Sequence, residues 1–168
     1  KHSGHYRLQS LRTLVVPWLE QGIRIDFYGQ DWNLMNPFLG MDIPSEWIHG
    51  HLPYIEAKKV YNSAEIILGL QNYEQLVTQR TFEILGSGGF LLTSDTPGVH
   101  SLFKPGHDLV VSSSPRETVR IVRNYLGECQ ERNRIRQQGR AAVVEHSYRH
   151  RAERIVQVLM EYGMLPNG

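Results

Sequence analysis

The chain has 168 residues, 40% hydrophobic and 21% charged, which suffices for one folded domain and excludes wholesale disorder. Its formal net charge of +1 argues against a histone-like partner or an acidic tail. No apolar run reaches the about 20 residues of a membrane span. The single cysteine, Cys129, can form neither an internal disulfide nor a thiolate metal site. We therefore expect a reduced, cytoplasmic protein without a resident metal or other cofactor.

Short apolar runs alternate with helical patterns along the chain. The expected strands are residues 23–28, 65–70, 90–94 and 108–112, with a further short strand at 47–52. The expected helices are residues 8–19, 53–63, 78–86, a short piece ending at 103, 114–126, 131–145 and 147–162. Residues 30–44 are expected to form a loop with at most a short helix.

Local signals mark several of these boundaries. Pro17 should kink or break the first helix, because proline lacks the N–H that a helix interior needs. Thr78 is a good N-cap for the helix that follows it. Ser114 and Glu117 have the S-x-x-E spacing of a capping box.

The order of elements predicts an α/β fold, in which a Rossmann-like parallel sheet is flanked by helices. We expect residues 1–168 to form a single domain, with a helical C-terminal part from about residue 114. In such a sheet, ligands bind beyond the carboxyl ends of the strands. Candidate site residues therefore follow the strands.

The segment 78–89 carries the clearest chemistry. A helix N-terminus attracts phosphate through its free N–H groups and its dipole. Arg80 in the first turn adds a charged fork that suits phosphate oxygens. Glu83, one turn further, can accept two hydrogen bonds from a ribose diol. The alternative is an i,i+3 surface pair of Arg80 and Glu83 with nothing bound, and the spacing alone leaves both open.

Residues 80–95, which read RTFEILGSGGFLLTSD, resemble the signature of group 1 glycosyltransferases, and are most similar to a subgroup named after a spore-maturation protein. Further matching pieces lie in the right order around this motif. They are Phe27-Tyr28-Gly29 with Trp32, Tyr54 to Lys58, Tyr61 to Ala64, Leu102-Phe103 with Gly106, and His146 to Ala152.

The resemblance implies the two-domain GT-B architecture, with this chain as its C-terminal, donor-binding half. The implied ligand is a nucleotide diphosphate sugar, often linked to uridine. Glu83 would hold the ribose hydroxyls, and Thr78, Gln79 and Arg80 would meet the diphosphate, with Thr81 in the same binding segment. Gly50, His51 and Leu52 would hold the base through backbone groups. The residues from Gly4 to Arg7 would form the first loop, with Arg7 as a second phosphate ligand.

The chain departs from the wider family in three ways. A glutamate expected eight positions before Glu83 would fall at Gln75, whereas Glu74 is one place off. The strand expected before Gly4 is absent, and the sequence begins without Met, so we expect a piece of a longer polypeptide. The acceptor-binding N-terminal domain and its catalytic base are then missing as well, and no catalytic residue can be named.

Other patterns have plainer interpretations. His146 and His150 have i,i+4 spacing, but no third ligand lies near them, so we favour helix capping over metal binding. Residues 116–154 hold ten arginines and five glutamates. A solvated helix surface explains this charge best, with peripheral contact to anionic lipid as the alternative and no role in nucleic-acid binding. Five aromatic residues are expected to pack in the core or at an interface rather than to stack on a base, and they are Trp18, Trp32, Trp47, Tyr28 and Tyr61.

Two further functions stay open from the sequence. One is a non-catalytic interaction module that keeps the α/β frame without binding a nucleotide. The other is a nucleotide-sugar epimerase of GT-B shape, which would turn over the free nucleotide sugar without an acceptor.

Overall fold

The computed structural model describes residues 2–165, and their side chains from residue 5 onward. The α-helices are α1 (His2–Leu14), α2 (Val16–Leu19), α3 (Asn36–Leu39), α4 (Tyr54–Ser63), α5 (Gln79–Gly86), α6 (Pro97–Leu102), α7 (Pro115–Gly127), α8 (Cys129–Ala142) and α9 (Tyr148–Glu161). The strands are β1 (Ile67–Gly69), β2 (Leu91–Ser94) and β3 (Val110–Ser112), and short 3-10 helices are η1 (Trp32–Met35), η2 (Ser45–Trp47) and η3 (Val144–His146).

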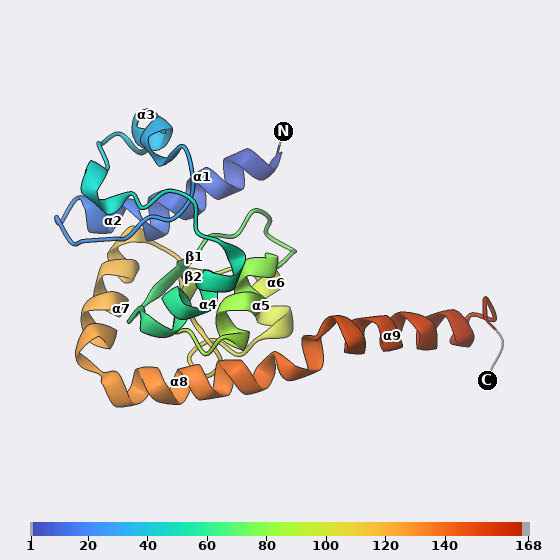
Figure 1. Cartoon of the computed structure of the whole chain (residues 1–168). Helices are drawn as coiled ribbons and strands as arrows, with labels where there is room; N and C mark the ends of the chain where they lie inside the picture. Colours follow the sequence, from blue (N-terminus) through green and yellow to red (C-terminus); the bar gives the residue numbers. More distant parts are fainter. Residues whose placement is uncertain (1, 166–168) are drawn as a thin grey trace.

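The three strands form a parallel sheet in the order β1-β2-β3, and helices lie on both of its faces (Figure 1). Side chains alternate along β2, so Phe90 and Leu92 pack with α1 and α7, while Leu91 packs with α4 and α5. Each strand is thus covered on two sides, as a parallel sheet requires. The predicted α/β fold is confirmed.

The N-terminal part differs from the prediction. The first helix begins at His2 and breaks at Val15, so the break precedes Pro17, which sits in the first turn of α2. The strands predicted at residues 23–28 and 47–52 are wrong, because only one isolated bridge joins Phe27 to Ile48. An extended segment becomes a strand only beside a partner, and a cleft separates residues 23–28 from β1.

The C-terminal part follows the prediction closely. Ser114 Oγ accepts a hydrogen bond from the N–H of Glu117 at 3.3 Å, and Glu117 Oε2 accepts one from the N–H of Ser113 at 2.9 Å. The predicted cap therefore forms, with its return bond shifted by one residue. The helix predicted over 131–145 is found as α8 and the 3-10 helix η3. Helix α9 begins after Ser147, whose Oγ accepts from the N–H of His150 at 3.3 Å.

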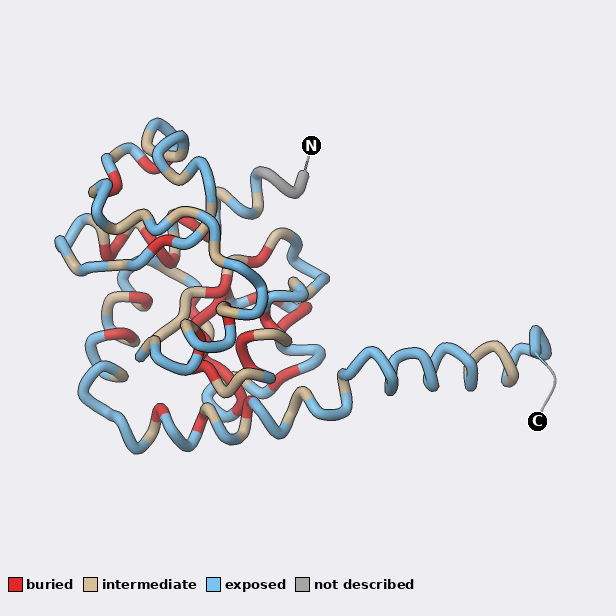
Figure 2. Tube along the Cα trace, in the orientation of Figure 1, coloured by how far each residue is buried: buried red, intermediate tan, exposed pale blue. Residues whose placement is uncertain are grey.

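Helix α9 projects from the body of the molecule and is largely exposed (Figures 1 and 2). Its apolar residues Ile155 and Val156 are 60% and 43% exposed. Across residues 2–165, no helix combines the length and the apolar character that crossing a bilayer demands.

Candidate functional site

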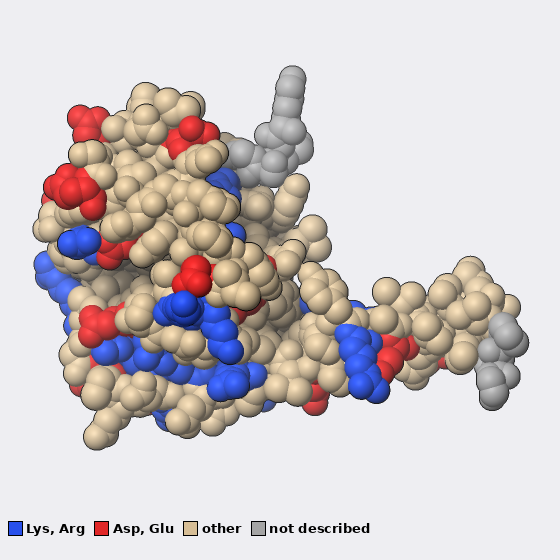
Figure 3. All heavy atoms as spheres, in the orientation of Figure 1, with Lys and Arg blue, Asp and Glu red and all other residues tan. Residues whose placement is uncertain are grey.

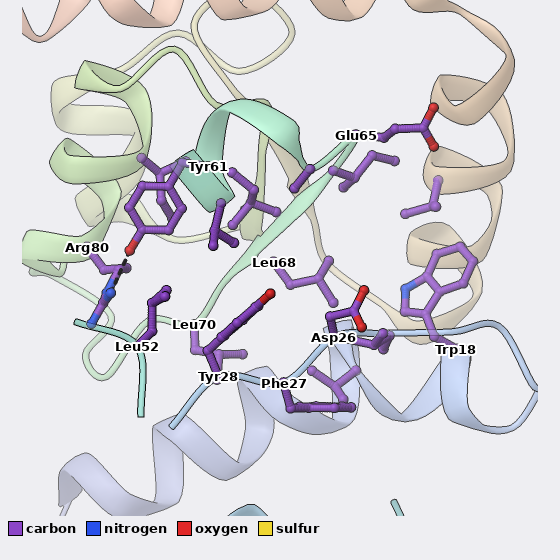
Figure 4. A pocket seen from close by; sticks show the side chains of 18 of the residues that line it. Trp18, Asp26, Phe27, Tyr28, Leu52, Tyr61, Glu65, Leu68, Leu70 and Arg80 are labelled. Carbon is purple, nitrogen blue, oxygen red and sulfur yellow. Dashed lines mark hydrogen bonds between the residues drawn. The ribbon is translucent and has the colours of Figure 1, made fainter. Parts of the chain in front are cut away.

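A cleft of about 870 Å³ runs along the free edge of β1 (Figure 4). Its polar end is formed by the N-terminus of α5 and by Tyr61 of α4. At the other end lies an apolar trough between the extended segment 23–28 and β1. We define this trough by its main lining residues, which are Trp18, Ile25, Phe27, Ile66, Leu68, Val122 and Leu126. The cleft is large enough for a nucleotide-sized ligand.

Three of the predicted residues of α5 open onto the polar end together with the N-cap residue. Thr78, Gln79, Arg80 and Glu83 all line the cleft. Gln79 Nε2 donates to Glu83 Oε1 at 3.0 Å, which holds that carboxylate in place. The Glu83 side chain is only 18% exposed, so its remaining acceptor positions face the cleft rather than open water.

Arg80 is partly engaged within the protein. Its Nη1 donates to the hydroxyl of Tyr61 at 2.5 Å, and its Nε lies 3.6 Å from Glu83 Oε2. The hydrogen bond to Tyr61 is the main reason that the pKa of Arg80 is raised above its usual range, and the charge of Glu83 adds a smaller contribution in the same direction. The Arg80 side chain is 60% exposed and its guanidinium has five N–H donors, so it can also bind an anion. Arg80 therefore forms the ion pair with Glu83 and also lines the cleft.

A buried amide fixes the N-terminus of α5. The side chain of Gln71 is 0% exposed, and its Oε1 accepts from the N–H of Thr78 at 3.0 Å. Its Nε2 donates to Thr81 Oγ1 at 3.0 Å and to Thr93 Oγ1 at 2.9 Å. Thr81 is itself fully buried and does not line the cleft, so its side chain serves the structure. Gln71 directly follows a predicted strand and so fell within the segment 71–80 expected near a ligand, but its three hydrogen bonds could not be predicted because they are tertiary.

The predicted base-binding segment is only partly at the cleft. Leu52 lines it, whereas Gly50 and His51 do not. Gly50 has φ +68° and its carbonyl accepts from the N–H of Gly29 at 2.6 Å, which ties this turn to the end of the segment 23–28. His51 is exposed.

The predicted first loop from Gly4 to Arg7 is wrong, because these residues belong to α1. The predicted loop would connect a preceding strand to the helix, but residues 4–7 already lie within α1, which begins at His2. For Gly4 the structure describes the backbone as part of α1 but not the surroundings of the residue. Arg7 is exposed and lines the cleft from α1, and its role as a phosphate ligand stays a prediction.

The two candidates for the family's earlier glutamate lie away from the cleft. Glu74 and Gln75 are both exposed and do not line it. The carbonyl of Glu74 accepts from the N–H of Gly98, and the backbone of Gln75 lies so close to Gly98 that a Cβ there would be 2.7 Å from its carbonyl carbon. Their backbone therefore packs against the start of α6.

Tyr28 and Asp26 line the cleft although they were not predicted as site residues. Tyr28 is 37% exposed, and its ring stacks on the imidazole of His49, with 5.0 Å between ring centroids and 25° between planes. Asp26 Oδ1 lies 2.7 Å from His49 Nε2, and this bond, with a second one from Arg24, lowers the pKa of Asp26. Their position just before Gly29, at the end of the apolar run, was the available signal.

The two histidines considered for a metal lie in different surroundings. His146 packs against the rings of Phe82 and Phe103, with centroids 5.7 and 5.9 Å away. His150 Nδ1 lies 2.7 Å from Ser147 Oγ. Within the part of the chain that the structure describes, no three His, Cys, Asp or Glu side chains are grouped as metal ligands would be. The favoured capping interpretation agrees with the Ser147 contact.

Basic side chains gather over α8 and the surface beside it, with acidic ones among them (Figure 3). Arg134 pairs with Glu131 at 2.6 Å, and Arg149 pairs with Glu153 at 2.8 Å. Such intermixed, exposed pairs are typical of a solvated surface.

Comparison with known proteins decides the family. A family model described as glycosyl transferase-like matches residues 7–157, which is most of the chain. The chain belongs to this family. The expected kinship with glycosyltransferases is therefore confirmed at this level, while the narrower spore-maturation subgroup stays a prediction. No curated protein matches this glycosyl transferase-like chain.

A crystal structure of Anabaena HepE in complex with UDP-glucose has the same fold, with a TM-score of 0.67 and 14% sequence identity. The alignment covers 95% of this chain and 46% of that one, so the chain spans less than half the length of this neighbour. The predicted GT-B glycosyltransferase fold class is confirmed by this likeness.

Proposed function

We propose that the chain is the donor-binding domain of a glycosyltransferase that transfers a sugar from a nucleotide diphosphate sugar to an acceptor. The observation that carries the proposal is the convergence of Thr78, Arg80 and Glu83 on one cleft at the N-terminus of α5. An isolated surface pair of Arg80 and Glu83 would need no cleft.

Each residue has a role that its surroundings suit. The diphosphate binds at the N-terminus of α5, where the helix dipole and Arg80 attract negative charge. Arg7 faces the same space from α1. Glu83, held by Gln79, accepts hydrogen bonds from the ribose diol. We favour uridine as the base because the HepE structure contains UDP-glucose.

The positive groups of this site also serve the reaction. Negative charge develops on the leaving diphosphate as the bond to the sugar breaks, and preorganised donors stabilise it. Arg80 and the N–H groups of α5 supply these donors. We therefore propose transfer that requires no divalent cation, and a cytoplasmic location for the domain.

We further propose that the acceptor and the catalytic base come from an N-terminal domain of the same polypeptide. The span of the HepE alignment supports this, because more than half of that protein lies outside it. The exposed apolar residues of α9 offer a surface for such a domain. The apolar trough suits the strand expected before Gly4. We also propose that the basic surface of α8 makes peripheral contact with anionic lipid headgroups.

Isothermal titration calorimetry with UDP, GDP and ADP tests the proposed function. Glu83→Ala removes the carboxylate that accepts from the ribose, so we expect UDP to bind at least about 10- to 150-fold more weakly, which is the loss of a single hydrogen bond to a charged group. Glu56→Ala is the matched control, since Glu56 pairs with Lys59 on α4 outside the cleft. The same titrations are repeated on a chain extended by the expected first strand. If only the extended chain binds, the strand was needed; if neither binds, the chain has no nucleotide site.

If neither folded form binds any of the three nucleotides, the proposal is overturned and the non-catalytic module is supported. In that case Arg80 serves only Tyr61 and Glu83. Conversion of a free nucleotide sugar without an acceptor would support the epimerase instead.

A further inference from the structure

We propose that the ring of Tyr28 is the platform on which the base of the nucleotide stacks. This rests on the proposed function, because it names the residue that holds the base in the same cleft. Among the described aromatic residues that line the cleft, Tyr28 is the exposed one, at 37%. Trp18, Phe27 and Tyr61 are buried, at 2%, 3% and 7%. Trp32 also lines the cleft but is half-buried, and its ring packs on Phe27 with 4.8 Å between centroids.

The backbone of Tyr28 is held from two sides. The indole Nε1–H of Trp32 donates to the carbonyl of Tyr28 at 3.0 Å. The N–H of the next residue, Gly29, donates to the carbonyl of Gly50 at 2.6 Å. The backbone that carries the ring is therefore fixed. Figure 4 shows the Tyr28 hydroxyl pointing into the cavity.

One face of the ring is backed by the imidazole of His49, which is itself held. The backbone N–H of His49 donates to the carbonyl of Phe27 at 2.8 Å, and the ring atom Nε2 lies 2.7 Å from Asp26 Oδ1. A ring that is already stacked and oriented loses little freedom when a base packs against it. Because Tyr28 also lines the cleft, the part of the ring that His49 does not cover faces the ligand space.

Tyr28 also lies where the base of a nucleotide bound by its phosphates at α5 would be expected. In Figure 4, Leu52 and Leu70 lie near Tyr28 in the cleft, and Arg80 lies beyond Leu52. A nucleotide whose diphosphate meets α5 can thus direct its base towards Tyr28, past the segment expected to hold it. Stacking on an aromatic ring suits any base, so discrimination between bases falls to the backbone groups near Leu52.

The test compares UDP with inorganic pyrophosphate, a probe that has the phosphates and no base. Stacking on an aromatic side chain contributes enough that its loss weakens binding roughly 5- to 150-fold. We expect this loss of UDP affinity in Tyr28→Leu, and a change of less than about twofold in Tyr28→Phe, which keeps the ring. Pyrophosphate affinity should be equal in all three proteins. Tyr54→Leu is the matched control, because Tyr54 is 76% exposed and lies outside the cleft lining.

A second readout needs no variant. A stacked uracil absorbs less near 260 nm, so UDP binding to the unaltered chain should give a hypochromic difference spectrum. If that spectrum is missing, or if folded Tyr28→Leu binds UDP as tightly as the unaltered chain, the stacking proposal is overturned. In that outcome Glu83→Ala still weakens binding and the proposed function stands. Failure of the unaltered chain to bind any nucleotide counts against both.

Discussion

Replacing Gln71 by Leu should strongly destabilise the domain. The amide is fully buried and makes three hydrogen bonds, to Thr78, Thr81 and Thr93. Leucine has nearly the same volume, so the loss is one of hydrogen bonding rather than of packing. The threonine hydroxyls keep other partners, since Thr93 Oγ1 donates to the carbonyl of Gly69 at 2.7 Å and Thr81 Oγ1 lies 3.3 Å from Thr78 Oγ1.

The N–H of Thr78 is therefore the group left without an acceptor. An unsatisfied buried donor costs about 1–3 kcal/mol, and each of the other two lost bonds costs about 0.5–1.5 kcal/mol. Because the hydroxyls can partly compensate, we expect a total of about 2–4 kcal/mol. The start of α5 should also loosen, which weakens nucleotide binding more than the stability loss alone would.

Urea unfolding measures the change as a lower midpoint at an unchanged m-value. Gln137→Leu is the control, because Gln137 is exposed on α8, and it should change the free energy of unfolding by less than about 0.5 kcal/mol. A loss below about 1 kcal/mol in Gln71→Leu would refute the role of this amide in holding α5.

Two further changes probe other parts of the fold. In Gly139→Ala the new Cβ would clash with the backbone carbonyl of Asp108, so α8 must shift away from this residue, and thermal melting should show that the free energy of unfolding falls by about 1–3 kcal/mol. Unchanged melting would contradict this close approach. The bond from His100, and a weaker one from Ser113, lower the pKa of Asp95 in the folded state. Its stabilising contribution is therefore complete above the ordinary carboxyl pKa of about 3.9 and is lost as the pH falls through the lower, folded pKa. Asp95→Asn should flatten the acid limb of the stability profile, and an unaltered limb would show that this carboxylate does not contribute.

The C-terminal half could be predicted because its signals are local. Ser114 and Glu117 mark the start of α7 by their spacing, and the continuous apolar run 90–94 has the length and composition of a buried strand. The segment 23–28 has an equally good local pattern, yet it forms no strand. A strand forms only where another strand pairs with it, and the local sequence of a segment does not show which segment, if any, will lie beside it.

The same distinction applies to the site. Arg80 and Glu83 could be placed together from their i,i+3 spacing, since both lie on one face of α5. Gln71 could not be found in this way, because its partners are up to 22 residues away along the chain. Tyr28 was expected in the core or at an interface rather than against a base, because large aromatic residues usually pack there, and only the fold shows that it lines a cleft.

The free edge of β1 has a consequence for how the chain behaves in solution. Since the N–H of Ile67 donates to the carbonyl of Phe90, the residue just before β2, the N–H and carbonyl of Leu68 point to the other side, where no strand of the described residues pairs with them. An edge that is both unpaired and bordered by apolar side chains templates the pairing of foreign strands. The feature that lets the domain accept a completing strand also makes it prone to edge-to-edge aggregation, which should grow with concentration and subside once that edge is occupied.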